Sequence, residues 1–230
     1  MAEKKYVLAI DQSTQGTKGI LFDAEGQLIC RRDVAHEQIV NEKGWVSHDL
    51  DEIYRNTLQV VQDVVTEAMA FAANPTDETY LIPAFSGLGA PYWKADAKAM
   101  LYGMSRTTGK NEIVCAALES IAYQIADIVE GMQYDKGISK SVLRVDGGAT
   151  ENAYLMQFQS DILQKKVEVS ACQEASAYGA ALLSGEKAEI YDDKVLSDLR
   201  ACQVYEPKMP ESKRQEKWQG WRNAMEKVLR

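Results

Sequence analysis

The chain has 230 residues, 46% of them hydrophobic and 26% charged, which fits a globular protein of one large domain or two small ones. Its 34 acidic and 26 basic residues give a net charge of −8 at pH 7 and a pI near 5.0. This balance argues against a nonspecific nucleic-acid partner and is ordinary for a small-molecule enzyme.

Cysteine spacing and hydropathy indicate the compartment. Cys30, Cys115, Cys172 and Cys202 are too far apart for a Cys-x-x-Cys motif and too few for a disulfide scaffold, so we expect reduced, mostly structural thiols. The N-terminus lacks a long apolar stretch of signal-peptide type, and no run of about 18 apolar residues follows. We therefore expect a cytoplasmic protein with no membrane partner.

The first part of the chain predicts a β-meander followed by a helix. Apolar runs at 6–10 and 19–23 flank a glycine-containing loop, Asp11-Gln-Ser-Thr-Gln-Gly-Thr-Lys-Gly19, and a third strand is predicted over 27–35. Apolar residues at mainly helical spacing predict a helix over 50–71, with a join at Thr66 and an end at Asn74-Pro75.

The rest of the chain alternates predicted strands and helices. A strand over 80–85 leads into a loop over 86–93, and a helix over 111–132 follows. Strands are predicted at 142–145 and 167–169 and helices at 152–163 and 175–183. A polar linker over 186–199 precedes a charged helix over 211–230, in which Trp218 and Trp221 share the face that packs inward. This rhythm predicts an α/β layer fold.

Two glycine-containing loops indicate a bound nucleotide. Val145-Asp-Gly-Gly-Ala-Thr-Glu-Asn152 joins a strand to a helix through consecutive glycines, which let a ligand approach the backbone. Together with the loop near the N-terminus, it suggests one nucleotide held at its two ends. The alternative for each loop in isolation is structural: a tight turn at Gly147-Gly148 and a helix N-cap at Asn152.

Several motifs together carry a family resemblance. They are Asp11-Gln-Ser-Thr-Gln-Gly-Thr-Lys18, Gly44-Trp-Val-Ser-His-Asp49, Pro83-Ala-Phe-Ser-Gly-Leu-Gly-Ala-Pro-Tyr-Trp93, Ala99-Met-Leu-Tyr-Gly-Met104 with Ala116-Ala-Leu-Glu119, Leu143-Arg-Val-Asp-Gly-Gly148 and Tyr178-Gly-Ala-Ala-Leu182. In these segments the chain resembles the FGGY carbohydrate kinases, and most closely their glycerol-kinase branch.

The resemblance implies an actin/hexokinase-like fold of two ribonuclease-H-like domains that close on MgATP. It also implies a truncated chain, with a partial N-terminal domain at 1–66 and a partial C-terminal domain at 67–230. Near 65–70 a segment expected from the family is absent. In the family, that segment carries the general-base aspartate, the polyol-binding residues and the second phosphate loop. Loss of a general base alone costs roughly two to four orders of magnitude in rate.

The candidate site residues combine this resemblance with residue chemistry. Asp11 is a hard oxygen ligand for Mg²⁺, usually through water, and Lys18 stands at a basic position of the family's loop, where arginine is usual in the glycerol-kinase branch. Backbone and side-chain donors complete the phosphate side, and an adenosine side follows the double glycine. The predicted cofactors are ATP and Mg²⁺, and the predicted nucleotide-binding residues are Thr14, Gln15, Gly16, Lys18, Gly147, Gly148 and Asn152.

The remaining motif residues receive no catalytic role. Tyr92 and Trp93 are expected to pack inward as structural anchors. Glu119 lies on a predicted amphipathic helix and Asp146 at a strand end, where capping and Mg²⁺ contact both remain open. The sequence has only two histidines, His36 and His48, which excludes a histidine-rich metal site, and neither is assigned a role.

Three hypotheses remain from the sequence. The first is an ATP-dependent polyol or sugar kinase that phosphorylates a primary hydroxyl. The second is a nonenzymatic adenine-nucleotide-binding pseudokinase. The third is an internally deleted fragment that needs a partner, because both domains lack sheet strands and expose unpaired edges. A homo-oligomer remains open in each case.

Overall fold

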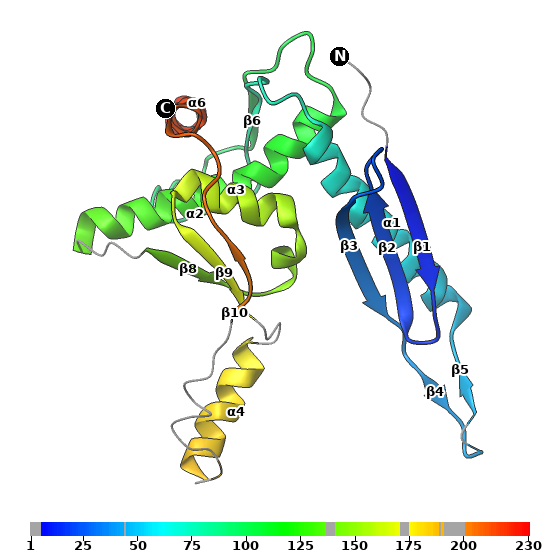
Figure 1. Ribbon diagram of the computed structural model, residues 1–230. Coiled ribbons are helices and arrows are strands. Elements are labelled where there is room, and N and C mark those ends of the chain that lie inside the picture. Colours follow the sequence, from blue (N-terminus) through cyan, green and yellow to red (C-terminus); the bar gives the residue numbers. More distant parts are fainter. Residues whose placement is uncertain (1–5, 44, 137–140, 171–174, 189, 191–200) are drawn as a thin grey trace. The chain divides into compact units, whose positions relative to one another are not determined.

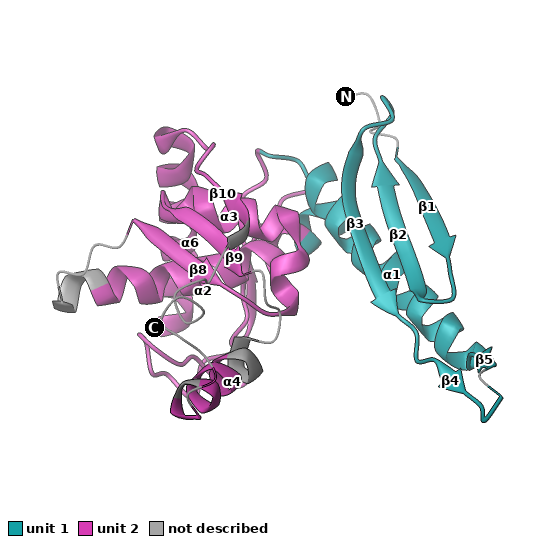
Figure 2. Cartoon of the chain, turned by 60° about the horizontal axis from the view of Figure 1, so that its bottom comes forward, with its two compact units in different colours: residues 1–75, 110–114 teal, residues 76–109, 115–230 magenta. Residues whose placement is uncertain are grey.

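The computed structural model describes residues 6–43, 45–136, 141–170, 175–188, 190 and 201–230 (Figure 1). The chain divides into two compact units (Figure 2). Unit 1 comprises Met1–Pro75 and Lys110–Val114, and unit 2 comprises Thr76–Gly109 and Cys115–Arg230. Each unit has its own secondary structure and its own buried apolar cluster.

Unit 1 is built on an antiparallel meander of β1 (Val7–Gln12), β2 (Gly16–Phe22) and β3 (Leu28–Ala35), as the sequence predicted. Asp23 shapes the second turn, because its Oδ1 accepts hydrogen bonds from the backbone of Glu25 at 3.0 Å and Gln27 at 2.8 Å. The first turn is shorter than expected. Both strands extend into the glycine-containing segment and leave only residues 13–15 outside them.

Helix α1 (Leu50–Ala72) packs along one face of this sheet (Figure 1). Asp49 caps its N-terminus by accepting from the Asp51 backbone at 2.9 Å. The helix is continuous through Thr66, whose hydroxyl donates to the Gln62 carbonyl at 2.8 Å without breaking it.

The contact between α1 and the sheet depends on small side chains and one buried ion pair. A Cβ at Gly19 would collide with the Val60 side chain, so glycine allows the helix to lie close to β2. Arg32 of β3 donates to the fully buried Glu67 of α1 at 2.5 Å. A short hairpin of β4 (Ile39–Val40) and β5 (Val46–Ser47) connects β3 to α1.

Unit 2 contains a three-stranded sheet in the order β10-β9-β8, formed by β8 (Val142–Val145), β9 (Lys166–Ser170) and β10 (Ala201–Tyr205). Strands β8 and β9 are parallel, and the connection between them carries the 3-10 helix η1 (Gly148–Glu151) and the helix α3 (Ala153–Leu163). This crossover is the arrangement that parallel strands require.

The described residues of unit 2 form two further short strands and three further helices. They are β6 (Tyr80–Ile82), β7 (Met100–Tyr102), α2 (Lys110–Lys136), α4 (Ala175–Lys187) and α6 (Glu211–Leu229). Strands β6 and β7 form an antiparallel pair, and α6 contacts both β6 and α3. The first turn of α2 is grouped with unit 1. The polar linker expected over 186–199 lies largely outside the described residues.

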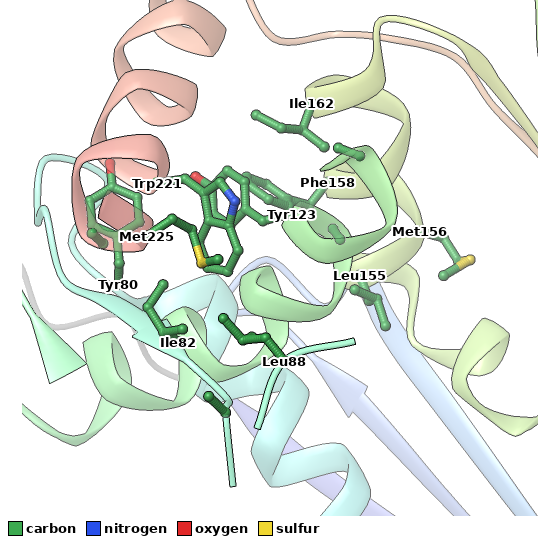
Figure 3. Packing of buried hydrophobic residues seen from close by; sticks show 14 of the residues in the cluster. Tyr80, Ile82, Leu88, Tyr123, Leu155, Met156, Phe158, Ile162, Trp221 and Met225 are labelled. Carbon is green, nitrogen blue, oxygen red and sulfur yellow. The ribbon is translucent and has the colours of Figure 1, made fainter. Parts of the chain in front are cut away.

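The core of unit 2 is aromatic (Figure 3). Trp221 of α6 stacks on Tyr123 of α2 with ring centroids 4.9 Å apart, and Phe158 of α3 meets the same tyrosine edge-on at 5.3 Å. Trp221 and Tyr123 are at most 1% exposed. The predicted inward face of the C-terminal helix is therefore confirmed. Burying a large apolar side chain stabilises the fold by about 1.5–3 kcal/mol, which explains why this face packs on the core.

The loop that precedes α2 differs from expectation. The predicted strand over 80–85 ends at Ile82, and the Phe85 side chain is 78% exposed. Tyr92 packs against the core as expected, but Trp93 is also 78% exposed and has a backbone φ of 51°. The expectation that Trp93 anchors the loop inward is therefore wrong. Its left-handed backbone turns the side chain to solvent while its neighbour fills the core.

Candidate functional site

The phosphate-side candidates lie at the first turn of unit 1. Asp11 on β1 and Lys18 on β2 stand opposite each other in the antiparallel register, and their Oδ2 and Nζ atoms are 3.6 Å apart. Their side chains are 58% and 36% exposed, so both remain accessible to a ligand. The structure therefore pairs a carboxylate with an ammonium group next to the turn.

The turn over residues 13–15 is held by its own hydrogen bonds. The Ser13 backbone and hydroxyl both donate to the Gly16 carbonyl, at 3.0 and 3.1 Å, and the Gln15 backbone donates to the Ser13 hydroxyl at 3.3 Å. Thr14 and Gln15 are exposed at its tip. These contacts leave the tip free to meet a ligand.

Gly16 has a structural reason to be glycine. It is buried, and a Cβ there would lie 2.5 Å from the Val34 carbonyl oxygen of β3. The missing side chain thus lets β2 and β3 approach each other at the base of the turn. From the sequence, Gly16 is counted among the backbone donors of the phosphate side, without a packing reason.

The adenosine-side candidates lie between β8 and α3 in unit 2. Gly147 has φ 90° and ψ 171°, a conformation that favours glycine, and η1 begins at Gly148. The backbone and hydroxyl of Thr150 both donate to the Gly147 carbonyl, at 3.0 and 2.7 Å. A Cβ at Gly147 or Gly148 would meet no protein atom within 4 Å. The double glycine therefore borders open space.

Asn152 caps the helix that follows the double glycine. Its Oδ1 accepts a hydrogen bond from the Leu155 backbone at 2.9 Å, and its backbone is extended, as expected of an N-cap. The structural alternative from the sequence is therefore correct for the side-chain oxygen. The amide nitrogen of the same side chain is a hydrogen-bond donor that does not take part in this cap.

The described structure places the candidates in two groups. The candidates Asp11, Thr14, Gln15, Gly16 and Lys18 belong to unit 1, and Gly147, Gly148 and Asn152 belong to unit 2. A separate cavity of about 310 Å³ in unit 2 is lined in part by Glu130, Lys165 and Trp218, and none of the candidates lines it.

Glu119 is buried rather than available to a ligand. It accepts from the Lys217 ammonium group with both oxygens at 2.9 Å and from the Tyr154 hydroxyl at 2.9 Å. Burial, with Glu119 beside the thiol, raises the pKa of Cys115 to about 12. The buried Glu119–Lys217 ion pair joins α2 to α6, and the bond from Tyr154 adds α3, so Glu119 has a structural role.

Sequence reasoning missed the position of His36. This residue is 7% exposed, and its backbone donates to the Gln15 carbonyl at 3.0 Å. It lies just after β3, more than twenty residues from the turn, so only the strand pairing brings it there. A lone histidine after a predicted strand gave no signal of this contact.

Two absences apply to the described parts of the chain. Among those residues, no group of three or more histidine, cysteine, aspartate or glutamate side chains is placed to hold a metal ion. None of the helices searched there is both long enough and apolar enough to cross a membrane.

Comparison with known proteins shows the family. Residues 24–186 match the model of the FGGY family of carbohydrate kinases, C-terminal domain. A glycerol kinase of Pasteurella multocida is 44% identical over 180 residues, which cover 76% of this chain and 36% of that protein. A Bacillus subtilis glycerol kinase is 39% identical over 178 residues, covering 76% of this chain and 36% of that protein. The chain thus spans about a third of the length of these relatives.

Solved structures agree with this relationship. A Plasmodium falciparum glycerol kinase crystallised with ADP matches all of this chain and 46% of its own, with a TM-score of 0.67 and 29% identity. A xyloylose kinase of Brucella ovis, at 18% identity, matches 96% of this chain and 48% of its own with a TM-score of 0.65, which supports the fold alone. The predicted truncated, actin/hexokinase-like α/β fold is therefore confirmed. By sequence and by fold, the chain belongs to the FGGY family of carbohydrate kinases.

Proposed function

We propose that this chain binds an adenine nucleotide with Mg²⁺ and is the nucleotide-binding part of a glycerol-kinase-type phosphotransferase. In the full reaction, ATP supplies a phosphoryl group for a primary hydroxyl of a polyol, and Mg²⁺ neutralises charge on the phosphates. The observation that carries the proposal is the open double-glycine turn before α3, in a chain 44% identical to a glycerol kinase. We place the protein in the cytoplasm, where such nucleotides are abundant.

The residues of unit 1 fit a phosphate group and its metal. Asp11 is more than half exposed, so its oxygens can meet Mg²⁺ directly or through water. The exposed tip of the turn offers donors from Thr14 and Gln15, and Lys18 adds a positive charge 3.6 Å from the carboxylate. A single carboxylate suits Mg²⁺, which keeps several waters and takes its other ligands from phosphate oxygens.

The residues of unit 2 fit a nucleoside. Gly147 and Gly148 border open space, so a flat base can approach the backbone without meeting a side chain. The side-chain oxygen of Asn152 caps α3, which leaves its amide nitrogen as a donor that we assign to the nucleoside. We also propose that 1–66 and 67–230 derive from the N-terminal and C-terminal domains of the family.

We expect little or no phosphoryl transfer by this chain alone. The sequence lacks the segment that carries the general-base aspartate of the family, and the other carboxylate opposite Lys18, Asp33, is paired with Arg31 at 2.7 Å. The missing general base costs roughly two to four orders of magnitude in rate, and poor substrate positioning costs more. Polyol or sugar specificity would come from a segment that this chain lacks.

One observation favours a second candidate, a fragment completed by another chain. Among the described strands β1 pairs only with β2, and its Val7 and Ile10 are 63% and 42% exposed. Helix α1 also exposes Tyr54 and Leu58. An apolar edge strand is a site for pairing with another strand, including one from a second copy of this chain.

Calorimetric titration with MgADP tests the proposed function. We expect binding by the wild type and loss of about tenfold or more in affinity for Asp11→Asn and for Gly148→Ala. The new Cβ at position 148 meets no protein atom, so its effect would arise in the ligand's space. Asp33→Asn is the matched control, because Asp33 is also an exposed aspartate of this sheet and pairs with Arg31 at 2.7 Å.

The outcome separates the three hypotheses. Binding without transfer of phosphate from MgATP to glycerol supports the pseudokinase, and transfer above a no-enzyme blank supports the kinase. Equal affinities for the wild type and both site variants would contradict the site proposed here. Binding or turnover that appears only after mixing with a second chain would support the fragment.

A further inference from the structure

The His36 side chain lies against both ends of the turn that carries the phosphate-side candidates. Its Nε2 atom is 2.6 Å from the side-chain amide nitrogen of Gln12, which precedes the turn, and 3.2 Å from the hydroxyl of Thr17, which follows it. Thr17 is fully buried and donates to Gln12 Oε1 at 2.9 Å. One imidazole therefore contacts the residues that fix where the turn begins and ends.

The other ring nitrogen joins His36 to helix α1. The side-chain nitrogen of Asn56 lies 3.0 Å from the Ala35 carbonyl and 2.9 Å from His36 Nδ1. A carbonyl oxygen only accepts, so the Asn56 group that faces it is the NH₂ group, and its second hydrogen points at Nδ1. Gln12 presents an NH₂ group to Nε2 in the same way, and a neutral imidazole accepts from only one of these two amides, because its other nitrogen carries the proton.

Two further contacts complete this polar cluster. The Thr57 hydroxyl lies 3.4 Å from Gln12 Oε1 and donates to the Ile53 carbonyl of α1 at 2.8 Å. The ring of His48, whose Nδ1 lies 3.2 Å from the Glu37 carbonyl, meets the His36 ring edge-on at 5.9 Å. His48 therefore lies beside the cluster, whereas the side chain that contacts Gln12 and Thr17 is that of His36.

We propose that His36 is a positioning residue that fixes the phosphate-binding turn by joining Gln12 and Thr17 to α1. Its backbone bond to the Gln15 carbonyl adds a third point of attachment, at the tip of the turn. A turn held at three points is already in place when an anion arrives, so less ordering accompanies binding. The ligand part of this inference rests on the proposed function, whereas the structural part does not.

Hydrogen exchange of the free protein tests the structural part. In His36→Leu we expect the amides of residues 13–17 to exchange faster, by about tenfold for the loss of one buried hydrogen bond. The β4–β5 hairpin should exchange at the wild-type rate. His36→Gln returns a hydrogen-bonding amide group near the Nε2 position and should restore much of the protection. His48→Gln is the matched control, and it should leave residues 13–17 unchanged. Unchanged exchange in His36→Leu would overturn the inference.

Nucleotide titration tests the ligand part. We expect His36→Leu to weaken MgADP binding about tenfold and to leave adenosine binding within twofold of the wild type, because only phosphates meet the turn. A general loss of folded structure in His36→Leu would weaken the binding of MgADP and of adenosine equally, and that result would overturn the positioning role. A wild-type chain that binds no MgADP would overturn the proposed function, and the exchange experiment would still decide for or against His36.

Discussion

At the scale of single residues, Asp127 of α2 is a buried carboxylate whose hydrogen-bond partner lies on another helix. It is 6% exposed and accepts a hydrogen bond from the Trp221 indole at 2.8 Å. Burial raises its pKa from 3.8 to about 6, and the bonds from Trp221 and Tyr92 offset only part of that cost. Asp127 offsets part of this desolvation cost by accepting from the Trp221 indole nitrogen, which would otherwise be buried without a hydrogen-bond partner.

The raised pKa predicts a dependence of stability on pH. The neutral acid suits the folded state, so its contribution is complete below about pH 3.8 and is lost as the pH rises through about 6. The cost of ionisation above that range is about 3 kcal/mol. Asp127→Asn stays neutral and keeps an oxygen for Trp221. Its free energy of unfolding, minus that of the wild type, should therefore rise between pH 4 and pH 7.

Chemical denaturation at a series of pH values measures that difference. Asp33→Asn serves as the control, because Asp33 is exposed and its replacement should give a difference with little pH dependence. A difference for Asp127→Asn that stays constant from pH 4 to pH 7 would show that burial does not set the protonation of this acid.

The sequence predicted the role of a residue where its hydrogen-bond partners are close in the chain, and missed it where the partners are distant in the chain. Asn152 was recognised as a possible N-cap because the helix it caps begins at the next residue. The burial of Glu119 against Lys217 depends on α6, almost a hundred residues away. The contact of His36 with the turn likewise depends on strand pairing. Long-range partners of this kind leave no periodic signal in a single sequence.

At the scale of elements, helix α6 approaches strand β6 at a glycine. A Cβ at Gly220 would collide with the ring and hydroxyl of Tyr80, a core residue that is 7% exposed. Gly131 of α2 is also helical, yet a Cβ there would meet nothing within 4 Å. The two positions separate the packing effect of glycine from its effect on helix propensity.

This contrast predicts opposite effects of the same substitution. Gly220→Ala should destabilise the protein by about 1–3 kcal/mol, because the well-packed core cannot make room for the methyl group. Gly131→Ala should stabilise it by about 0.5–1 kcal/mol, because alanine loses less conformational freedom in a helix. Urea denaturation of both variants measures the difference. Equal effects at the two positions would mean that α6 does not pack on Tyr80 as described.

Elements with strong periodicity were predicted and elements that depend on pairing were not. The long helices α1 and α2 and the C-terminal α6 follow from apolar spacing along the chain. Strand β10 was missed, since its five residues are a strand only through antiparallel pairing with β9. The first loop was drawn too long for the same reason, because the β1–β2 register continues into it.

At the scale of the whole molecule, length is the feature that most restricts function. The chain spans about a third of its glycerol-kinase relatives, yet it folds into two units that each carry one set of candidate nucleotide contacts. The α/β class followed from the alternation of predicted strands and helices, whereas the actin/hexokinase-like fold followed from the family motifs. Those motifs lie along almost the whole chain, which is why the fold could be predicted despite the missing segment.

The central claim is that this shortened chain is a folded nucleotide-binding protein. Thermal unfolding with and without MgADP tests it most directly, with adenosine alone as the comparison. A ligand at about 100 times its dissociation constant adds about 2.7 kcal/mol to the folded state. We predict one cooperative transition that MgADP raises by several degrees and adenosine raises less. A transition that millimolar MgADP leaves unchanged would contradict the claim.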